Sequence, residues 1–231
     1  MTTLTPHRWY QGTDFWSWAE AQSVPVAPAD AKPTMVWLDK ETTGLDPINE
    51  VPLEVGVILT DDMGNLIPDG AATWFVSDFN DFYWSRRIEA MIPLVREMHE
   101  KSGLLADLAE LAKYPYNSRT AAQVEFGVTS WLIRAFRGGP VEDKDKLPPF
   151  GSSIGFDRGF MQNWMPELNK WFHYRNGDLS ALRIFAYKHL PHLKKLEPEK
   201  RELHRPLPDL IDSIKLYRFL INNIFIEPVG E

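Results

Sequence analysis

The sequence of 231 residues contains no cysteine. This absence excludes disulfide frameworks, cysteine-ligated zinc sites and thiol chemistry. The sequence also has no run of about 18 uncharged apolar residues, so it predicts no transmembrane helix. Residues 1–18 lack the basic start and the apolar stretch of a signal peptide. We therefore expect a protein of a reducing compartment, the cytoplasm, with no membrane partner.

The sequence has fewer positive than negative charges. It contains 25 lysines and arginines and 32 aspartates and glutamates, which gives a net charge of −7. This balance disfavours a basic protein that coats duplex nucleic acid, because such proteins gain affinity by releasing counterions. The glycine-rich patterns GxxxxGK[ST] and GxGxxG are also absent, which argues against a nucleotide-binding loop of either type. The surplus of carboxylates is what a divalent-metal site needs.

In other respects the composition is that of an ordinary globular protein, with 44% hydrophobic and 25% charged residues. The beginning of the chain differs from the rest, because Trp9 and two further tryptophans precede a stretch rich in alanine and proline at 24–33. The prolines prevent a continuous helix or a central strand there. We expect an N-terminal arm over residues 1–33 and one domain over 34–231. The arm either packs on that domain or binds a partner.

Hydrophobic periodicity predicts the secondary structure of the domain. Short apolar and β-branched runs predict strands at 34–39, 53–60, 73–76 and 147–154. The turn between the second and third runs makes the first three strands an antiparallel meander. Apolar residues three and four apart predict helices at about 85–98, 120–136, 158–172, 180–189 and 210–225. This order is typical of an α/β domain with a mixed sheet flanked by helices.

Two acidic residues end the first predicted strand. Asp39 and Glu41 are two positions apart, so both side chains point to one side of the strand. Two carboxylates this close repel each other unless a positive charge lies between them or one stays protonated. A hard divalent cation with oxygen ligands removes the repulsion. The alternative is an ordinary surface strand end, which often carries the same spacing.

Two further groups lie where later helices begin. Asp157 follows the predicted strand at 147–154 and opens a helix, where it is either a functional carboxylate or an N-terminal cap. Pro208 fits the first turn of the last helix, which leaves His204 on the preceding loop and Asp209 in the first turn. A histidine in this place is either a surface residue or a general base.

These residues occur in a fixed order along the chain: Asp39-x-Glu41-x-x-Gly44-Leu45, then Asp157, then His204-x4-Asp209. The pattern resembles the DEDDh family of 3′–5′ exonucleases. The resemblance implies a ribonuclease H-like fold, with two divalent cations, Mg²⁺ or Mn²⁺, bound by Asp39, Glu41, Asp157 and Asp209. It also implies that His204 takes a proton from the attacking water and that a nucleoside 5′-monophosphate leaves the 3′ end.

Three further segments, within a similarity that covers about residues 34–225, resemble the oligoribonucleases of this superfamily. They are HEKSGL at 99–104, GSSIGFDR at 151–158, and MPEL at 165–168 with FHYR at 172–175, Asp178 and Ser180. The resemblance implies hydrolysis of short single-stranded RNA. It also implies the residues that bind this substrate: Leu45 on the bases, Ser153, Arg175 and Ser180 on the 5′ phosphate, and His99 in the same pocket.

The same resemblance implies a homodimer, in which Tyr174 of one chain reaches into the substrate pocket of its neighbour. Trp171 and Phe172 beside it either extend this contact or close the core of their own chain. Glu54, on the second predicted strand, also has a counterpart in the family, and we interpret it either as a supporting residue of the metal site or as a structural residue.

Two positions depart from the family pattern. Leu94 stands where oligoribonucleases usually have a tryptophan that stacks on a base, and a leucine offers apolar contact without stacking. Pro206 stands where they usually have alanine, which places His204 slightly differently. The first departure favours a second hypothesis, an exonuclease of DNA or of longer single-stranded RNA. A third hypothesis, an inactive nucleic-acid-binding or interaction domain, is disfavoured because all four carboxylates and His204 are present.

Overall fold

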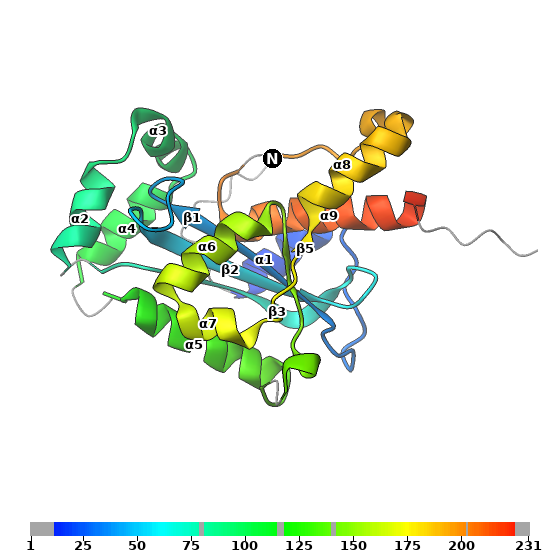
Figure 1. Ribbon diagram of the computed structural model, residues 1–231, viewed down its shortest axis with the longest axis horizontal. Helices are drawn as coiled ribbons and strands as arrows, with labels where there is room; N and C mark the ends of the chain where they lie inside the picture. The colour runs from blue at the N-terminus through cyan, green and yellow to red at the C-terminus, as the bar shows by residue number, and fades with distance from the viewer. Residues whose placement is uncertain (1–11, 79–80, 115–117, 140–141, 202, 225–231) are drawn as a thin grey trace, which may run out of the picture.

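The computed structural model describes residues 12–78, 81–114, 118–139, 142–201 and 203–224. A five-stranded sheet in the order β3-β2-β1-β4-β5 runs through the molecule, with helices on both sides (Figure 1). Its strands are β1 Met35–Thr42, β2 Pro52–Thr60, β3 Leu66–Phe75, β4 Pro149–Gly151 and β5 Gly177–Asp178. The predicted class, α/β with a mixed sheet flanked by helices, is confirmed.

Nine helices flank the sheet within the described ranges. They are α1 Gly12–Ala21, α2 Phe82–Glu89, α3 Pro93–Lys101, α4 Leu104–Ala112, α5 Ala121–Ala135, α6 Ile154–Trp164, α7 Pro166–Trp171, α8 Leu179–His189 and α9 Pro206–Ile224. Two short 3₁₀ segments, η3 Asp143–Asp145 and η4 Pro191–Lys195, also occur. In this part of the chain, no helix has the length and the apolar character needed to cross a membrane.

The antiparallel meander of β1, β2 and β3 is confirmed. Asp39 of β1 lies opposite Gly56 of β2, and Glu41 lies opposite Glu54. On its other side β1 pairs in parallel with β4, which in turn pairs with β5. The central strand of the sheet is therefore the one that ends in the two predicted carboxylates.

Prolines explain where two helices differ from the predicted periodicity. The helix expected at 85–98 is divided into α2 and α3, because Pro93 begins a new helix and Ile92 before it is extended. The helix expected at 158–172 is divided at Pro166 into α6 and α7. A proline has no amide hydrogen to donate, so it starts a helix more readily than it continues one.

Three other predicted elements have different bounds. The strand expected at 73–76 is the end of β3, which already begins at Leu66. The strand expected at 147–154 shrinks to β4, because helix α6 already begins at Ile154. The last helix begins at Pro206, four residues before the predicted 210–225, since a proline costs nothing in a first turn. Its predicted last residue, Phe225, lies outside the described residues.

A hydrophobic cluster lies on each face of the sheet. Val36 and Leu38 of β1 belong to one cluster, whereas Met35 and Trp37 belong to the other, as the two-residue period of a strand requires. Phe15 of α1 is buried in the second cluster, together with residues of α8 and α9. The described part of the N-terminal arm thus packs on the domain, while Trp9 lies outside the described residues.

Candidate active site

Three carboxylates meet at the end of the central strand. The strand presents Asp39 and Glu41 on one side, and the first turn of α9 adds Asp209. One carboxylate oxygen from each of the three lies within 4.8 Å of the other two. Gly56, opposite Asp39, permits this approach, because a Cβ there would lie 2.4 Å from the Cβ of Pro206. A side chain at position 56 would push the start of α9 away from the sheet.

Asp157 joins the same site from the first turn of α6 and is buried. Its charge is one cause that raises the pKa of Asp39 and of Glu41, which places it within electrostatic reach of both. Lys40, on the other side of β1, donates a hydrogen bond to the backbone carbonyl oxygen of Asp157 over 3.0 Å. This bond holds the start of α6 against the central strand.

The site holds four carboxylates and too little positive charge to balance them. Burial, and then repulsion by neighbouring carboxylates, raise the pKa of Asp39 and of Glu41 well above their usual values. Burial raises the pKa of Asp157 to about 7 and that of Asp209 to about 6. Oδ1 of Asp157 and Oδ1 of Asp209 are buried without a hydrogen-bond partner. A cluster of oxygen ligands with unpartnered lone pairs suits a hard divalent cation.

His204 lies on the loop two residues before the start of α9, as predicted, and its backbone is left-handed with a φ of 51°. A left-handed conformation at a residue other than glycine costs free energy, so the surrounding contacts must hold it in place. The charge of His204 is one cause that lowers the pKa of His99, which places the two imidazoles near each other.

His99 itself lies behind the carboxylates. It is completely buried, its Nε2 lies 2.8 Å from the carbonyl oxygen of Thr42, and its Nδ1 lies 3.8 Å from Oε2 of Glu41. Burial is the main cause that lowers its pKa. The structure therefore places His99 against Glu41 and the backbone of β1, rather than on an open surface of the substrate pocket.

A second buried charge cluster adjoins the first, and sequence reasoning recognised only one of its members. Nε of Arg205 donates to Oε2 of Glu54 over 2.8 Å, and its Nη1 donates to Oδ2 of Asp107 in α4 over 2.8 Å. All three side chains are buried. The cluster ties β2 and α4 to the residue that follows His204. Arg205 lies within the predicted pattern His204-x4-Asp209, but the sequence indicated no role for it. No pattern in the sequence pointed to Asp107.

The structure brings together two of the predicted substrate-binding residues. The Oγ atoms of Ser153, before α6, and Ser180, in the first turn of α8, lie 3.0 Å apart. Oδ1 of Asp178 accepts hydrogen bonds from the backbone amides of both serines. The loop after β1 carries Leu45, which is exposed, and α3 carries Leu94, which is 75% exposed.

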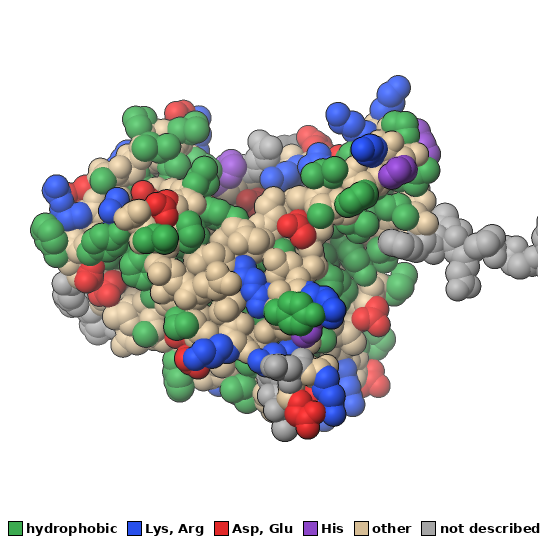
Figure 2. Space-filling model, in the orientation of Figure 1, with side chains coloured by type: hydrophobic (Ala, Val, Ile, Leu, Met, Phe, Trp, Pro, Cys, Tyr) green, Lys and Arg blue, Asp and Glu red, His purple; other side chains and the backbone are tan. Residues whose placement is uncertain are grey.

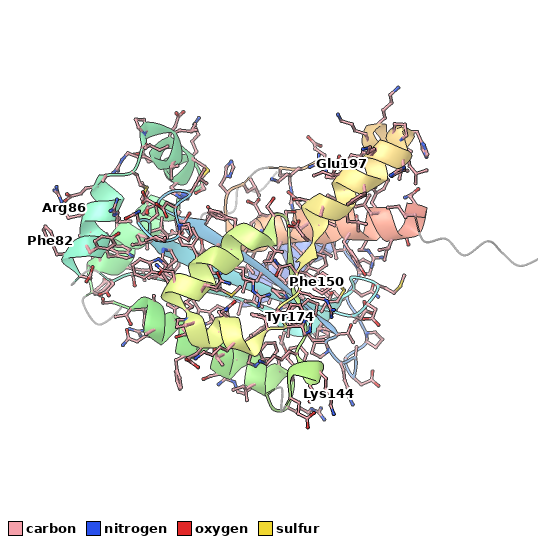
Figure 3. All side chains as sticks on the ribbon, viewed as in Figure 1. Phe82, Arg86, Lys144, Phe150, Tyr174 and Glu197 are labelled. Atoms are coloured by element: carbon pink, nitrogen blue, oxygen red, sulfur yellow. The ribbon has the colours of Figure 1, made fainter. Side chains whose placement is uncertain are left out.

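Tyr174 and Arg175 lie on a separate surface segment. Tyr174, labelled in Figure 3, is 72% exposed. The guanidinium of Arg175 lies 4.9 Å from the centre of its ring. Nη1 of Arg158 donates to the carbonyl oxygens of His173 and Arg175 and so anchors the segment. Of the three aromatic residues in this segment, Trp171 and Phe172 are buried in the core of their own chain, whereas Tyr174 is exposed.

The chain resembles known proteins in sequence and in fold. No family model matches it. An oligoribonuclease of Mycobacterium sp. strain KMS is 30% identical over 196 residues, which cover 85% of this chain and 83% of that protein. An oligoribonuclease of Streptomyces coelicolor is 33% identical over 196 residues, which cover 85% and 89%. The chain belongs to the oligoribonuclease family. It is accordingly a nuclease, as the motifs predicted.

Solved structures of exonuclease I share the fold of this family member. A zinc-bound complex of E. coli exonuclease I with single-stranded DNA superposes with a TM-score of 0.59 at 15% identity, over 84% of this chain and 41% of that one. The enzyme of Methylocaldum szegediense gives 0.55 at 17% identity, over 82% and 40%. The chain thus spans about two fifths of the length of these exonucleases. The predicted ribonuclease H-like fold is confirmed.

Proposed function

We propose that the chain is a 3′–5′ exoribonuclease that hydrolyses short single-stranded RNA to nucleoside 5′-monophosphates. The observation that carries this proposal is the buried carboxylate cluster, in which Oδ1 of Asp157 and of Asp209 have no partner. Asp39, Glu41, Asp157 and Asp209 would hold two divalent cations, Mg²⁺ or Mn²⁺, since both favour carboxylate oxygens. When bound, the two cations supply Lewis acidity and neutralise charge at the scissile phosphate.

His204 is the general base of this proposal. Its imidazole takes a proton from the attacking water, and the oxygen of that water forms a bond to phosphorus as the bond to the 3′ oxygen breaks. A proton then passes to the 3′ oxygen, which becomes the new end of the shortened strand. The left-handed backbone of His204 and the buried contacts of Arg205 support this role, because together they restrict where the imidazole lies.

The other end of a short substrate is bound by the two serines and the arginine predicted from the family. The hydroxyls of Ser153 and Ser180 lie side by side, and we infer that they receive the 5′ phosphate together with Arg175. Leu45 contacts the bases through its exposed side chain. In this scheme Tyr174 closes the pocket of a second copy of the chain, so the active form is a homodimer.

A turnover series on 5′-labelled RNA of two to about twenty nucleotides tests the proposal. With Mg²⁺ or Mn²⁺ present, we expect stepwise shortening from the 3′ end and the fastest turnover on the shortest strands. A chelator and the Asp157→Asn variant should both abolish cleavage. Absence of cleavage under all conditions would favour an inactive binding domain. Light scattering on the same sample tests the dimer, since a mass near 26.6 kDa denotes a single chain.

A second candidate function, exonuclease activity on DNA or on longer RNA, is favoured by Leu94. This leucine stands on α3 with 75% of its surface exposed, and it cannot stack on a base as a tryptophan does. Without stacking, a dinucleotide loses part of the affinity that distinguishes it from longer strands. A parallel series on DNA of the same lengths decides between the two candidates.

A further inference from the structure

Helix α1, in the N-terminal arm, precedes the part of the chain that carries the family motifs. Phe15 of this helix is buried in the second hydrophobic cluster, and Trp16 and Trp18 pack against that cluster. Leu210 of α9 belongs to the same cluster. The arm therefore shares a hydrophobic core with the helix that contributes Asp209 to the active site.

Trp18 also contacts the segment that leads into the active site. The segment comprises residues 196–205, between η4 and α9, and we call it the His204 loop. Figure 2 shows blue and purple side chains along this loop. The guanidinium of Arg201, within the loop, lies 4.6 Å from the centre of the Trp18 ring. A guanidinium is attracted to the face of an aromatic ring, and most strongly to that of tryptophan, so the arm holds the loop at this point.

Arg201 is also fixed to α9. Its backbone amide donates to Oδ2 of Asp212 over 2.9 Å, and its Nε and Nη2 donate to Oδ1 over 3.0 and 2.5 Å. Asp212 is buried and follows Asp209 by three residues on α9. The guanidinium thus binds a carboxylate with its edge and faces the Trp18 ring, a combination that its planar shape allows. Arg201 joins the arm, the His204 loop and α9.

The His204 loop is anchored on both sides of His204. Arg201 precedes it by three residues, and Arg205, held by two buried carboxylates, follows it directly. The charge of Lys200 lowers the pKa of Asp209, so the part of the loop beside Arg201 lies within electrostatic reach of the carboxylates. Two anchors around a short peptide restrict its backbone, as the left-handed conformation of His204 requires.

We propose that α1 is part of the active-site structure, because the ring of Trp18 on Arg201 positions the His204 loop and with it the imidazole of His204. Trp18 and Arg201 are positioning residues in this inference, since they act through the loop. The inference rests on the proposed exoribonuclease function and adds the N-terminal arm to the elements that this function needs. A catalytic group displaced by about 1 Å can lower a rate by about 100-fold, so a contact outside the site affects turnover.

The full chain with Trp18→Leu tests the inference, because leucine keeps apolar contact with the cluster but offers Arg201 no ring. Trp16→Leu is the matched control, since Trp16 packs on the same cluster and its described aromatic partner is Phe15. Trp18→Phe retains a smaller ring. Hydrogen exchange of the backbone amides of residues 200–205 is measured by mass spectrometry without metal. The catalytic constant and KM for a dinucleotide are measured well below the melting temperature of each variant.

We expect Trp18→Leu to exchange the amides of residues 200–205 faster than the parent, because the loop opens more readily. Its catalytic constant should fall by about tenfold, with KM unchanged. Trp18→Phe should recover most of both losses. Trp16→Leu should lower the melting temperature but leave exchange of the loop and turnover as in the parent. In an Arg201→Lys background, Trp18→Leu should have little further effect, since the two residues act as one unit.

Equal losses of turnover in Trp18→Leu and Trp16→Leu would overturn the inference, because α1 would then have only a structural role. Exchange of the loop at the parent's rate in Trp18→Leu would overturn it as well. Failure of the proposed function is distinguishable from both outcomes. In that case the parent cleaves no dinucleotide, whereas the exchange of residues 200–205 still reports whether Trp18 holds the loop.

Discussion

Two buried carboxylate clusters lie on adjacent strands, and they are compensated in different ways. Glu54 of β2 shares the guanidinium of Arg205 with Asp107. Its register partner Glu41 belongs to the other cluster. No lysine or arginine of the described residues forms an ion pair with the four carboxylates of that cluster, Asp39, Glu41, Asp157 and Asp209. Lys40, the nearest basic side chain on the strand, donates to a backbone carbonyl instead.

The presence or absence of a paired arginine distinguishes a cluster with a structural role from one with a binding role. Buried charges are costly unless they are paired, and the protein supplies an arginine where the charges only hold elements together. It leaves the other cluster without such a partner, and Oδ1 of Asp157 and of Asp209 lie buried with no hydrogen-bond partner in the described structure. Natural proteins accept such a local cost at functional sites. The uncompensated cluster is therefore where we expect a cation to bind.

The largest effect is expected from Asp39→Asn, which removes a charge from the uncompensated cluster. Turnover should fall by about 10⁴-fold or more, because metal ions contribute several kcal/mol to transition-state stabilisation. The melting temperature of the chelator-treated protein should rise, since one repulsive charge is gone. Asp30→Asn, a change at an exposed aspartate, is the control. Normal turnover of Asp39→Asn with RNA would contradict the metal site.

The uncompensated cluster was predictable from the sequence, but the compensated one was not. Asp39 and Glu41 follow an apolar run with the period of a strand, so local geometry places them together. The partners of Arg205 are 151 and 98 residues away from it, and no spacing or periodicity connects residues so far apart. The family pattern brought in Asp157, for which the residues alone left capping of a helix as an alternative, and Asp209 in the first turn of the last helix.

The next effect in size is expected from His204→Ala, since His204 lies beside the compensated cluster and is the general base that we propose for the other. The catalytic constant should fall by about 10²–10⁴-fold, the usual contribution of a general base. Affinity for Mn²⁺, measured by calorimetry, should change little, because His204 is not proposed as a ligand. His192→Ala, an exposed histidine on η4, serves as control. A variant whose main defect is weaker Mn²⁺ binding would contradict the assignment of His204 as the general base.

A smaller effect is expected from Asp107→Asn, which weakens the compensated cluster without touching a proposed metal ligand. Arg205 then keeps one carboxylate, Glu54, and the segment with His204 is held less precisely. We expect the catalytic constant to fall by about 10–100-fold, as for residues that orient catalytic groups, while KM for a dinucleotide stays the same. The melting temperature should also fall, because a buried guanidinium loses a partner.

Glu167→Gln is the matched control for Asp107→Asn, because it breaks an exposed ion pair with Lys170. Surface ion pairs contribute only about 0–1 kcal/mol to the free energy of unfolding. Its turnover and its melting temperature should both match those of the parent. If Asp107→Asn melts earlier but turns over normally well below its melting temperature, the compensated cluster is only structural and does not position His204.

The smallest and most reversible effect concerns pH in the chelator-treated protein. Unfolded aspartates titrate near pH 3.9, whereas folded Asp157 and Asp209 have pKa values of about 7 and about 6. Between these limits the folded chain binds more protons than the unfolded chain. The contribution of Asp157 and Asp209 to the free energy of unfolding is therefore fully present below about pH 4. It is lost as the pH rises through the pKa values of the two groups in the folded chain.

We therefore expect the melting temperature of the chelator-treated protein to be several degrees lower at about pH 8 than at about pH 5.5. Excess Mn²⁺ should remove most of that difference, because a cation replaces the protons as the compensating charge. Asp39→Asn should flatten the same profile, whereas Asp30→Asn should not. A chelator-treated parent whose stability rises over this range would mean that the carboxylates of the site are already compensated within the folded chain, and the contrast with the Arg205 cluster would disappear.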